Sequence, residues 1–528
     1  MTSVRVSDTM AASAEPRSPF LAWLERHGLT LVLLAAIGGL LAHAGLVANF
    51  WSDDAFITYR YARNIATGLG PVYNPGERVE GYSNPLFTFL LAAFYRVVPG
   101  PHALPWFARA LCVASAIATL VALSRLRDQV SAWILGSAIL LCVMNTSFAV
   151  WSVGGLETTI YGALITIAFV VTLKVPGSPR AQAGVGLLLA AIALSRPEGV
   201  LPAGALFLFR LLESRTRADL PGHLRVAMFA AVPVAAYVTF RQVYFGQWLP
   251  NTFFAKQLDR TQAFWRGVWY SKEFLERNGS LAVYAPALLA PLGTPGERRA
   301  ARLAVMVIAI YGVFLFVVGG DWMSNHRFIA PFVPVLFLVV ATGWVSLLRL
   351  VRDGLSSQGS RRAAWAIPLG CAFLCALFAR PEMLVTRDQR IRPNMSVLPY
   401  FDVIGRVVGY GARPEWSLAT HDIGAVGWYG GTRILDMLGL VRRNRPRPDH
   451  QRRCDRSPAS RAGAAPLRQP PATSRALASG RDVELRFALH LGARSARPSP
   501  LTPRAPGRRG GVQPQSRTRS TVPAAGSG

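Results

Sequence analysis

The stretch WSDDAFITYRYARN (51–64) follows directly on the apolar run LTLVLLAAIGGLLAHAGLVANF (29–50). A helix that spans a bilayer needs about 20 predominantly apolar residues, so this run is long enough for a first transmembrane helix. It is too long for the core of a signal peptide, and no small-residue cleavage site follows it. Two adjacent carboxylates, Asp53 and Asp54, therefore lie where the chain is predicted to leave the membrane.

The composition of the whole chain also indicates a membrane protein. Of the 528 residues, 51% are hydrophobic and 16% are charged, whereas soluble domains have about 25% charged residues. The hydrophobic residues form blocks of about the length of a membrane span, separated by short polar stretches. We expect a mainly α fold, a polytopic bundle of transmembrane helices with about 11 crossings, in which the short apolar piece 85–99 is a juxtamembrane or re-entrant helix.

The composition changes abruptly after residue 440. Residues 441–528 hold 19 arginines and no lysine, isoleucine or tryptophan, and they are rich in Pro, Ala, Gly and Ser. Such a segment buries too little apolar surface to offset its ordering entropy, so we expect it to be disordered. Three origins are open: an out-of-frame translation of GC-rich coding sequence, a plain extension, or a basic tail that binds anionic lipid or RNA.

Neither the charge nor the cysteines indicate a nucleic-acid partner or a cofactor. Much of the formal net charge of +29 lies in the tail, and the other basic residues lie mostly in short loops, so we predict no nucleic-acid partner. The five cysteines form no CxxC pair and no Cys/His cluster. We expect no cofactor. A divalent cation at Asp53 and Asp54 is a weaker alternative, because adjacent side chains diverge.

Basic residues in the short loops predict the orientation of the helices. Clusters around Arg125, Lys174, Arg210, Arg298 and Arg349 alternate with turns that lack such clusters. The positive-inside rule assigns the basic loops to the cytoplasm and the other turns to the opposite face. Asp53, Asp54 and the polar motifs described next then lie together on the outer face.

The aspartate pair admits a structural and a catalytic interpretation. Ser52 can cap a helix that stops at Gly68, and aspartates in its first turn would then only stabilise the helix N-terminus. However, Arg60 and Arg63 lie on the same helical face as Asp53. A carboxylate beside guanidinium groups just outside a bilayer suits chemistry on a lipid-linked phosphate, because arginine binds phosphate in a bidentate manner and a carboxylate takes a proton from a hydroxyl.

Further polar motifs belong to the same predicted face. In YNPGERVEGYSNPL (73–86), Glu80 lies either in a solvated loop or above a groove for the acceptor. In GGLETTIYG, Glu157 either caps a helix or lines a cavity. In LPNTFFAK, Asn251 and Lys256 are candidates for the same cavity.

Two motifs place charges next to predicted spans. In LSRPEGVL, Arg196 and Glu198 interrupt an apolar run, so they either neutralise each other or line a polar cavity. In GGDWMSNHRFIAPFVP, Asp321 either pairs with Arg327 or lines the cavity. His326 and Arg327 are candidates for binding the phosphate of a donor.

Together, the stretches DDAFITYRYARN, GGLET, SRPEG, LPNTFFAK, GGDWMSNHRF and HDIGAVGWYG resemble the polyprenyl-phosphate-dependent glycosyltransferases of the GT-C superfamily, in particular the bacterial branch that contains the mycobacterial terminal arabinofuranosyltransferase. The resemblance covers roughly residues 30–440 and ends after Leu440. It implies a GT-C-like transmembrane domain, an outer C-terminal domain, and a catalytic carboxylate in the first outer loop. That carboxylate is Asp53 or Asp54, and position in the sequence does not decide between them.

The predicted organisation has four segments. Residues 1–28 form a cytoplasmic N-terminal segment, and 29–380 form the GT-C-like transmembrane domain with its first outer loop at 51–84. Residues 381–440 begin an extracytoplasmic α/β domain, in which ATHDIGAVGWYG is predicted to be a strand and a turn. The disordered tail, 441–528, follows.

These observations predict a glycosyltransferase of the bacterial plasma membrane. It would move a pentose such as arabinofuranose, or a hexose, from a polyprenyl-phosphate donor to a cell-envelope glycan, lipid or protein on the outer face. One of the two aspartates would deprotonate the acceptor, and Arg60, Arg63 and Arg327 would stabilise the phosphate leaving group without a metal. If the reaction retains anomeric configuration, the carboxylate instead acts as a nucleophile or stabilises an ion pair. The alternatives are a lipid or polysaccharide transporter or flippase, and an inactive membrane scaffold.

Overall fold

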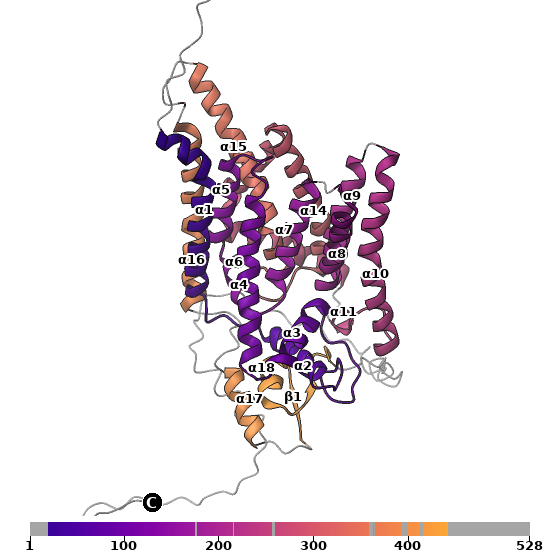
Figure 1. Ribbon diagram of the computed structural model, residues 1–528. Coiled ribbons are helices and arrows are strands. Elements are labelled where there is room, and N and C mark those ends of the chain that lie inside the picture. Colours follow the sequence, from indigo (N-terminus) through magenta and orange to yellow (C-terminus); the bar gives the residue numbers. More distant parts are fainter. Residues whose placement is uncertain are drawn as a thin grey trace, which may run out of the picture. The chain divides into compact units, whose positions relative to one another are not determined.

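The computed structural model describes residues 19–174, 177–214, 216–255, 259–357, 363, 365–391, 400–411 and 416–441, and these residues are mostly helical (Figure 1). Most of the predicted N-terminal segment and all but the first residue of the predicted tail lie outside the described residues. The predictions made for them stay predictions.

The elements follow one another along the chain as labelled in Figure 1. The first helices are α1 (Pro19–Leu46), α2 (Asp53–Ala66), α3 (Pro85–Val97), α4 (Ala103–Ser124), α5 (Ala132–Met144), α6 (Thr146–Val153), α7 (Thr158–Lys174), α8 (Pro179–Ser195) and α9 (Val200–Glu213). They are followed by α10 (Leu220–Phe245), α11 (Asn251–Ala255), α12 (Arg260–Arg277), α13 (Ser280–Tyr284), α14 (Pro295–Val318), α15 (Val333–Ser357), α16 (Ala366–Ile391), α17 (Tyr400–Gly411) and α18 (Gly424–Gly430). Short 3-10 turns are η1 (Pro197–Gly199), η2 (Arg217–Asp219), η3 (Ala285–Leu292) and η4 (Ala330–Phe332), and the strands are β1 (Ser417–Thr420) and β2 (Arg433–Asp436).

Within the described ranges, six helices are long and apolar enough to cross a membrane, namely α1, α4, α10, α14, α15 and α16. The pair α5 and α6, bent by 62° at its break, makes a seventh if it is counted as one span. Several other helices, α3 and α7 among them, are apolar but shorter. The chain is thus the predicted multi-pass helical membrane protein, and the expected count of about 11 crossings stays a prediction.

Apolar packing holds the bundle together and continues into the part of the chain next to it. The largest cluster of buried hydrophobic side chains includes Leu135, Ile165 and Val340, from α5, α7 and α15. A second cluster includes Trp151 of α6 and Trp428 of α18 together with side chains of α2. The elements α2 and α18 therefore pack against the bundle through this second cluster.

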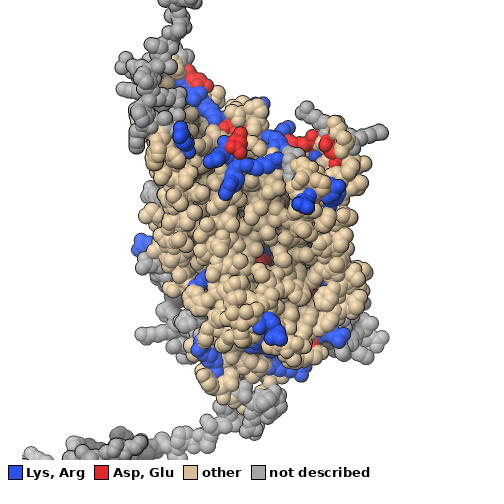
Figure 2. Space-filling view, viewed as in Figure 1, with Lys and Arg blue, Asp and Glu red and all other residues tan. Residues whose placement is uncertain are grey.

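The two groups of loops distinguished by charge lie at opposite ends of the bundle. Near the start of α14, Arg299 pairs with Glu213 at the end of α9, with 2.6 Å between Nη2 and Oε2. The other ends of the same two helices, Val318 and Val200, line a common cavity. Figure 2 shows charged residues gathered near both ends, with a broad band of mainly uncharged surface between them, as expected for a bundle that spans a membrane.

The helix α2 has the predicted limits, but its predicted cap is absent. It begins at Asp53 and ends at Ala66, and Gly68 follows with φ of 84°, a backbone conformation that glycine adopts readily. Ser52 occupies the N-cap position without a hydrogen bond from its side chain to the helix. The break in LSRPEGVL is also as predicted, since α8 ends at Ser195 and η1 separates it from α9.

The segment after residue 416 forms a small α/β element. Strands β1 and β2 pair in parallel, with Ser417 opposite Arg433, and α18 lies between them in the sequence. The stretch predicted to be a strand and a turn is therefore a strand followed by a short helix. The helix forms because residues 424–430 pack against α2 and α17, and the sequence alone does not show this packing.

The predicted boundary between residues 380 and 381 falls inside α16. This helix continues through Pro381, and Glu382 then accepts hydrogen bonds from the backbone N–H of Thr146 (2.7 Å) and the side-chain amide of Asn145 (2.9 Å). These bonds tie α16 to the bend between α5 and α6. The helix therefore runs across the predicted boundary, and an extracytoplasmic domain after residue 380 stays a prediction.

Candidate active site

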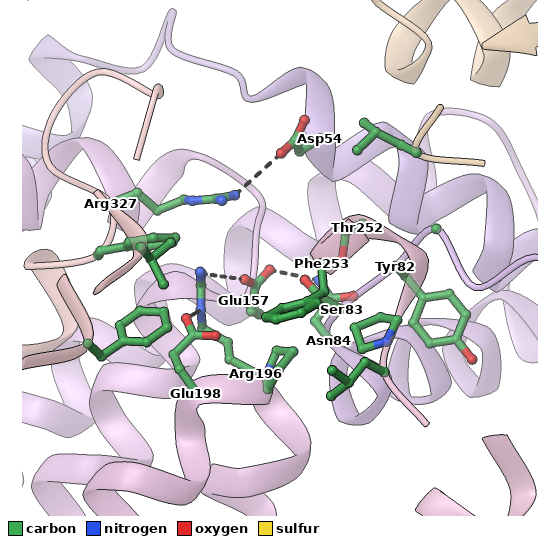
Figure 3. Close-up of a pocket in the computed structure, with 18 of the residues that line it drawn as sticks. Asp54, Tyr82, Ser83, Asn84, Glu157, Arg196, Glu198, Thr252, Phe253 and Arg327 are labelled. Atoms are coloured by element: carbon green, nitrogen blue, oxygen red, sulfur yellow. Dashed lines mark hydrogen bonds and ion pairs between the residues drawn. The ribbon is translucent and has the colours of Figure 1, made fainter. Parts of the chain in front are cut away.

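A cavity of about 730 Å³ opens at the end of the bundle opposite the Arg299–Glu213 pair (Figure 3). Its walls come from α2, from the loop before α3, from the break between α8 and α9, from the segment before α11, and from the residues around the end of α14. The charged side chains that line it are Asp54, Glu157, Arg196, Glu198, Arg260 and Arg327.

Asp54 and Arg327 face each other across this cavity. The Nη1 atom of Arg327 lies 3.4 Å from Oδ2 of Asp54, and its Nε atom lies 2.5 Å from Oδ2 of Asp321. Burial alone would lower the pKa of Arg327, but the negative charges of Asp321 and Asp54 outweigh it and raise the pKa. The guanidinium therefore stays charged, held between one carboxylate that lines the cavity and one behind it.

The loop that carries Arg327 has an uncommon backbone conformation. Asn325 and His326 have φ of 59° and 46°, the left-handed region that residues with a side chain rarely adopt. The ring of His326 does not line the cavity; it packs beside Tyr270 and Phe274, with ring centroids 5.1 and 5.3 Å away. Burial lowers the pKa of His326 to about 3, so it is neutral and is not placed to bind a phosphate as predicted.

A second buried network forms the floor of the cavity. Arg196 donates to Glu157 (Nη1 to Oε1, 2.8 Å) and to Glu198, and the amide of Asn84 donates to the other oxygen of Glu157 (2.7 Å). The structure thus contains both the predicted Arg196–Glu198 pair and the predicted cavity lining. Glu157 directs its side chain to Arg196 and Asn84 and does not cap α7. Such a network is stable when buried only because each charge has partners.

Asp53 points away from the cavity, although it precedes Asp54 directly. Its two oxygens accept hydrogen bonds from the backbone N–H groups of Gly424 and Ala425 in α18, both at 2.8 Å. A Cβ on Gly424 would lie 2.0 Å from the Asp53 carbonyl oxygen, so the contact requires glycine. Burial raises the pKa of Asp53 to about 7 against the lowering effect of the two N–H bonds. Asp53 therefore attaches α18 to α2.

Arg60 and Arg63 also contact α18 rather than the cavity. Arg60 is 2% exposed and donates to the carbonyl of Gly427 (2.6 Å), to those of Tyr73 and Thr432, and to the side chain of Asn74. Arg63 donates to the Trp428 carbonyl (3.3 Å) and stacks over its ring. The predicted shared face of Asp53, Arg60 and Arg63 exists, but it docks a neighbouring element. The expected role in phosphate binding does not fit this placement.

Two further candidates, Glu80 and Asn251, hold loops in place. Glu80 forms an ion pair with Arg241 of α10, with 2.6 Å between Oε2 and Nε, and its Oε1 atom accepts a hydrogen bond from the hydroxyl of Tyr237 (2.6 Å). Asn251 donates through its side-chain amide to the carbonyls of Gly439 and Leu440, at 2.7 and 2.8 Å. Neither side chain lines the cavity. Lys256 lies outside the described residues.

Sequence reasoning missed Arg260, the first residue of α12. Its side chain lines the cavity and, among the described residues, forms no ion pair. The sequence signal that could have found Arg260 is the aspartate before it, because Asp is a preferred N-cap residue and Asp259 follows closely on LPNTFFAK. In the structure, the side chain of Asp259 accepts a hydrogen bond from the N–H of Thr261 (2.9 Å) at the start of α12. An exposed arginine at a cavity mouth is available to a ligand.

The cavity has an apolar wall that reaches the outer surface of the bundle. Val200 and Leu201 at the start of α9, and Phe314 and Val317 at the end of α14, line it. Val200 is 51% exposed and Val317 is 68% exposed, so both also contact the surroundings of the bundle. The site therefore combines an ionic floor with an apolar side whose residues are also exposed on the outside of the bundle.

Comparisons with known proteins agree with this arrangement. The chain is 28% identical over 375 residues to a terminal β-(1→2)-arabinofuranosyltransferase of Corynebacterium glutamicum, covering 61% of this chain and 53% of that protein. It is 28% identical over 328 residues to the protein of the same name from Mycobacterium tuberculosis, covering 53% and 50%. The chain spans about half the length of the curated relatives it matches.

Solved structures share the fold at low sequence identity. ArnT from Cupriavidus metallidurans, bound to undecaprenyl phosphate, matches with a TM-score of 0.53 and 13% identity over 78% of this chain and 86% of that chain. The Archaeoglobus fulgidus oligosaccharyltransferase matches with a TM-score of 0.51 and 12% identity over 79% and 65%.

A family model described as "Domain of unknown function (DUF8728)" matches residues 385–471. The match crosses residue 440, where the composition changes, and the domain boundary predicted there stays a prediction. Taken with the helical bundle and its cavity, the comparisons identify the kind of protein. The chain is a multi-pass membrane protein with the GT-C fold that is similar in sequence to the terminal arabinofuranosyltransferases.

Proposed function

We propose that the protein transfers a sugar, in the first instance arabinofuranose, from a polyprenyl-phosphate donor to a hydroxyl group of a cell-envelope glycan, lipid or protein. One observation carries the proposal: Asp54 and Arg327 face each other in a cavity whose apolar wall includes side chains exposed on the outside of the bundle. A carboxylate and a guanidinium are the two groups that transfer from a lipid phosphate needs.

The two kinds of lining suit the two parts of such a donor. An isoprenoid chain would lie against the apolar ends of α9 and α14, where Val200 and Val317 are exposed. Its phosphate would meet Arg327 and Arg260, the cations that line the cavity beside the internally paired Arg196. Arginine suits this task because its planar group matches phosphate geometry.

Asp54 would act as the general base. The acceptor hydroxyl gives its proton to the Asp54 carboxylate while its oxygen forms a bond to the anomeric carbon of the sugar. The bond between that carbon and the phosphate oxygen breaks, and its electron pair leaves with the polyprenyl phosphate. Arg327 and Arg260 neutralise the charge that develops on the phosphate, so the proposed reaction needs no metal ion.

The comparisons support the choice of substrates. The curated relatives carry the name terminal arabinofuranosyltransferase, and ArnT was solved with undecaprenyl phosphate. Carriers of this kind place the reaction at a membrane. We propose the bacterial inner membrane with the cavity on the extracytoplasmic face, because the predicted basic loops gather at the opposite end of the bundle.

The test compares Asp54→Asn with Asp53→Asn in the full chain, purified in detergent. A polyprenyl-phosphate-linked arabinofuranose donor and an arabinan oligosaccharide acceptor are supplied, with and without EDTA. Asp54→Asn keeps the shape of the side chain but cannot accept the proton, so we expect turnover to fall about 100-fold or more. Asp53→Asn is the matched control, because Asp53 contacts α18 and not the cavity.

Two results would contradict the proposal. Full turnover in Asp54→Asn, with loss in Asp53→Asn, would assign the reaction to the other carboxylate. Loss of turnover of the wild-type protein in EDTA, restored by magnesium, would show that a cation takes the place assigned to the arginines.

A further inference from the structure

We propose that Trp151 is a positioning residue for the reaction: it holds the loop 319–329 so that Arg327 faces Asp54 and the donor phosphate. This inference rests on the proposed function. It concerns a side chain that is outside the cavity and acts only through Arg327.

Trp151 contacts the loop through one buried hydrogen bond. Trp151 lies in α6 and is 1% exposed, and its indole Nε1–H donates to the carbonyl oxygen of Asn325 at 2.8 Å. The ring itself is held by an edge-on contact with Phe50, whose centroid is 5.4 Å away. The donor is therefore fixed by its packing, and it reaches the loop two residues before Arg327.

The loop needs such a contact because of its conformation. Asn325 and His326 both have positive φ, and side-chain-bearing residues keep this conformation only where surrounding contacts impose it. A return of either residue to an ordinary conformation would turn the chain just before Arg327. The guanidinium would then leave the position 3.4 Å from Asp54.

The other partners of Arg327 do not replace this contact. Asp321, which binds Arg327 at 2.5 Å, belongs to the same loop and moves with it. Tyr270 of α12 accepts from the N–H of Phe328 (3.1 Å) and so holds the loop after Arg327. The hydrogen bond from Trp151 holds the loop before Arg327. The segment between these two contacts therefore sets the position of the Arg327 guanidinium.

Helix α6 is a suitable support because it is tied to the bundle at both ends. At its start, the N–H of Thr146 donates to Glu382 of α16 (2.7 Å). At its end, the carbonyl of Val153 accepts from Arg109 of α4 (2.8 Å). Trp151 therefore fixes the loop that carries Arg327 relative to the bundle.

The test uses Trp151→Phe with Trp344→Phe as the matched control. Trp344 is also buried, and its Nε1–H donates at 2.8 Å to a backbone carbonyl, that of Val283, away from the cavity. Both substitutions remove the same kind of bond. We expect Trp151→Phe to lower kcat/KM for the donor about tenfold, which corresponds to about 1.4 kcal/mol, and to leave the acceptor KM unchanged. Trp344→Phe should leave both values within about twofold of the wild type.

A double-mutant cycle with Arg327→Lys shows whether Trp151 acts through Arg327. If it does, Trp151→Phe has little further effect in the Arg327→Lys background, because the group that it positions is already altered. Should Trp151→Phe fail to fold, 3-benzothienylalanine at position 151 removes the N–H and retains the ring shape.

Each outcome bears on one of the two claims. Three results would overturn the positioning role while the glycosyltransferase proposal stands. Trp151→Phe could have the same kinetics as the wild type, or effects equal to those of Trp344→Phe. The effects of Trp151→Phe and Arg327→Lys could also be fully additive. Absence of turnover in the folded wild-type protein would refute the proposed function, and the positioning role with it.

Discussion

The attachment of α18 to α2 should weaken as the pH rises, because it depends on a buried carboxyl group. Burial raises the pKa of Asp53 from 3.8 to about 7 in the folded protein, and the neighbouring charges of Asp54 and Asp422 act in the same direction. A group whose pKa is raised by folding stabilises the folded form while it is protonated. That contribution is complete below about pH 4 and is lost as the pH rises through 7.

The size of the effect follows from the same values. A rise of the pKa from 3.8 to about 7 corresponds to about 4 kcal/mol over the full titration. Between pH 5 and pH 8, about 3 kcal/mol of this would be lost, so the equilibrium constant for opening of α18 should rise about 100-fold.

Hydrogen exchange of the full chain in detergent measures the opening of α18. Protection of the amides at 424–430 is recorded at pH 5, 6, 7 and 8, corrected for intrinsic exchange, with amides of α15 as the internal reference. Protection of these amides in the wild type should fall as the pH rises. In Asp53→Asn, their protection should be weaker than in the wild type at pH 5 and should not change with pH. Protection of α18 that is constant or increases between pH 5 and pH 8 would refute the assignment of a raised pKa to Asp53.

Two more substitutions probe other parts of the same framework. Arg60→Lys should destabilise residues 416–441 by about 3 kcal/mol, since a single ammonium cannot reach the three carbonyls and one amide that Arg60 binds; limited proteolysis should then cleave there first, and unchanged cleavage would speak against this role. Glu382→Ala should lower the unfolding free energy by about 3 kcal/mol, because the buried N–H of Thr146 and the amide of Asn145 lose their acceptor. Thermal unfolding in detergent, with the exposed Glu276→Ala as control, measures this, and equal shifts for the two variants would count against it.

The membrane character and the grouping of the polar motifs could be predicted from the sequence, because both depend on local composition. Apolar blocks of span length make helices regardless of their neighbours, and arginines in short loops mark one end of them. The motifs around Asp54, Glu157, Arg196 and Arg327 were expected together, and all of them line one cavity. Asp321 lies just behind them, bound to Arg327.

The choice between the two aspartates could come only from the tertiary structure. Neighbouring residues on a helix point about 100° apart, so Asp53 and Asp54 necessarily face different surroundings. The surroundings of Asp53 are residues 424–425, far along the sequence, and those of Asp54 include Arg327.

The same reason explains the arginines of α2. Helical spacing correctly put Arg60 and Arg63 on the face of Asp53, but it cannot show whether that face meets a ligand or another part of the chain. The sequence by itself determined a helical membrane protein with its polar motifs on one face. Only the packing of α18 and of the loop 319–329 against α2 decided which charges bind protein and which are free to meet a substrate.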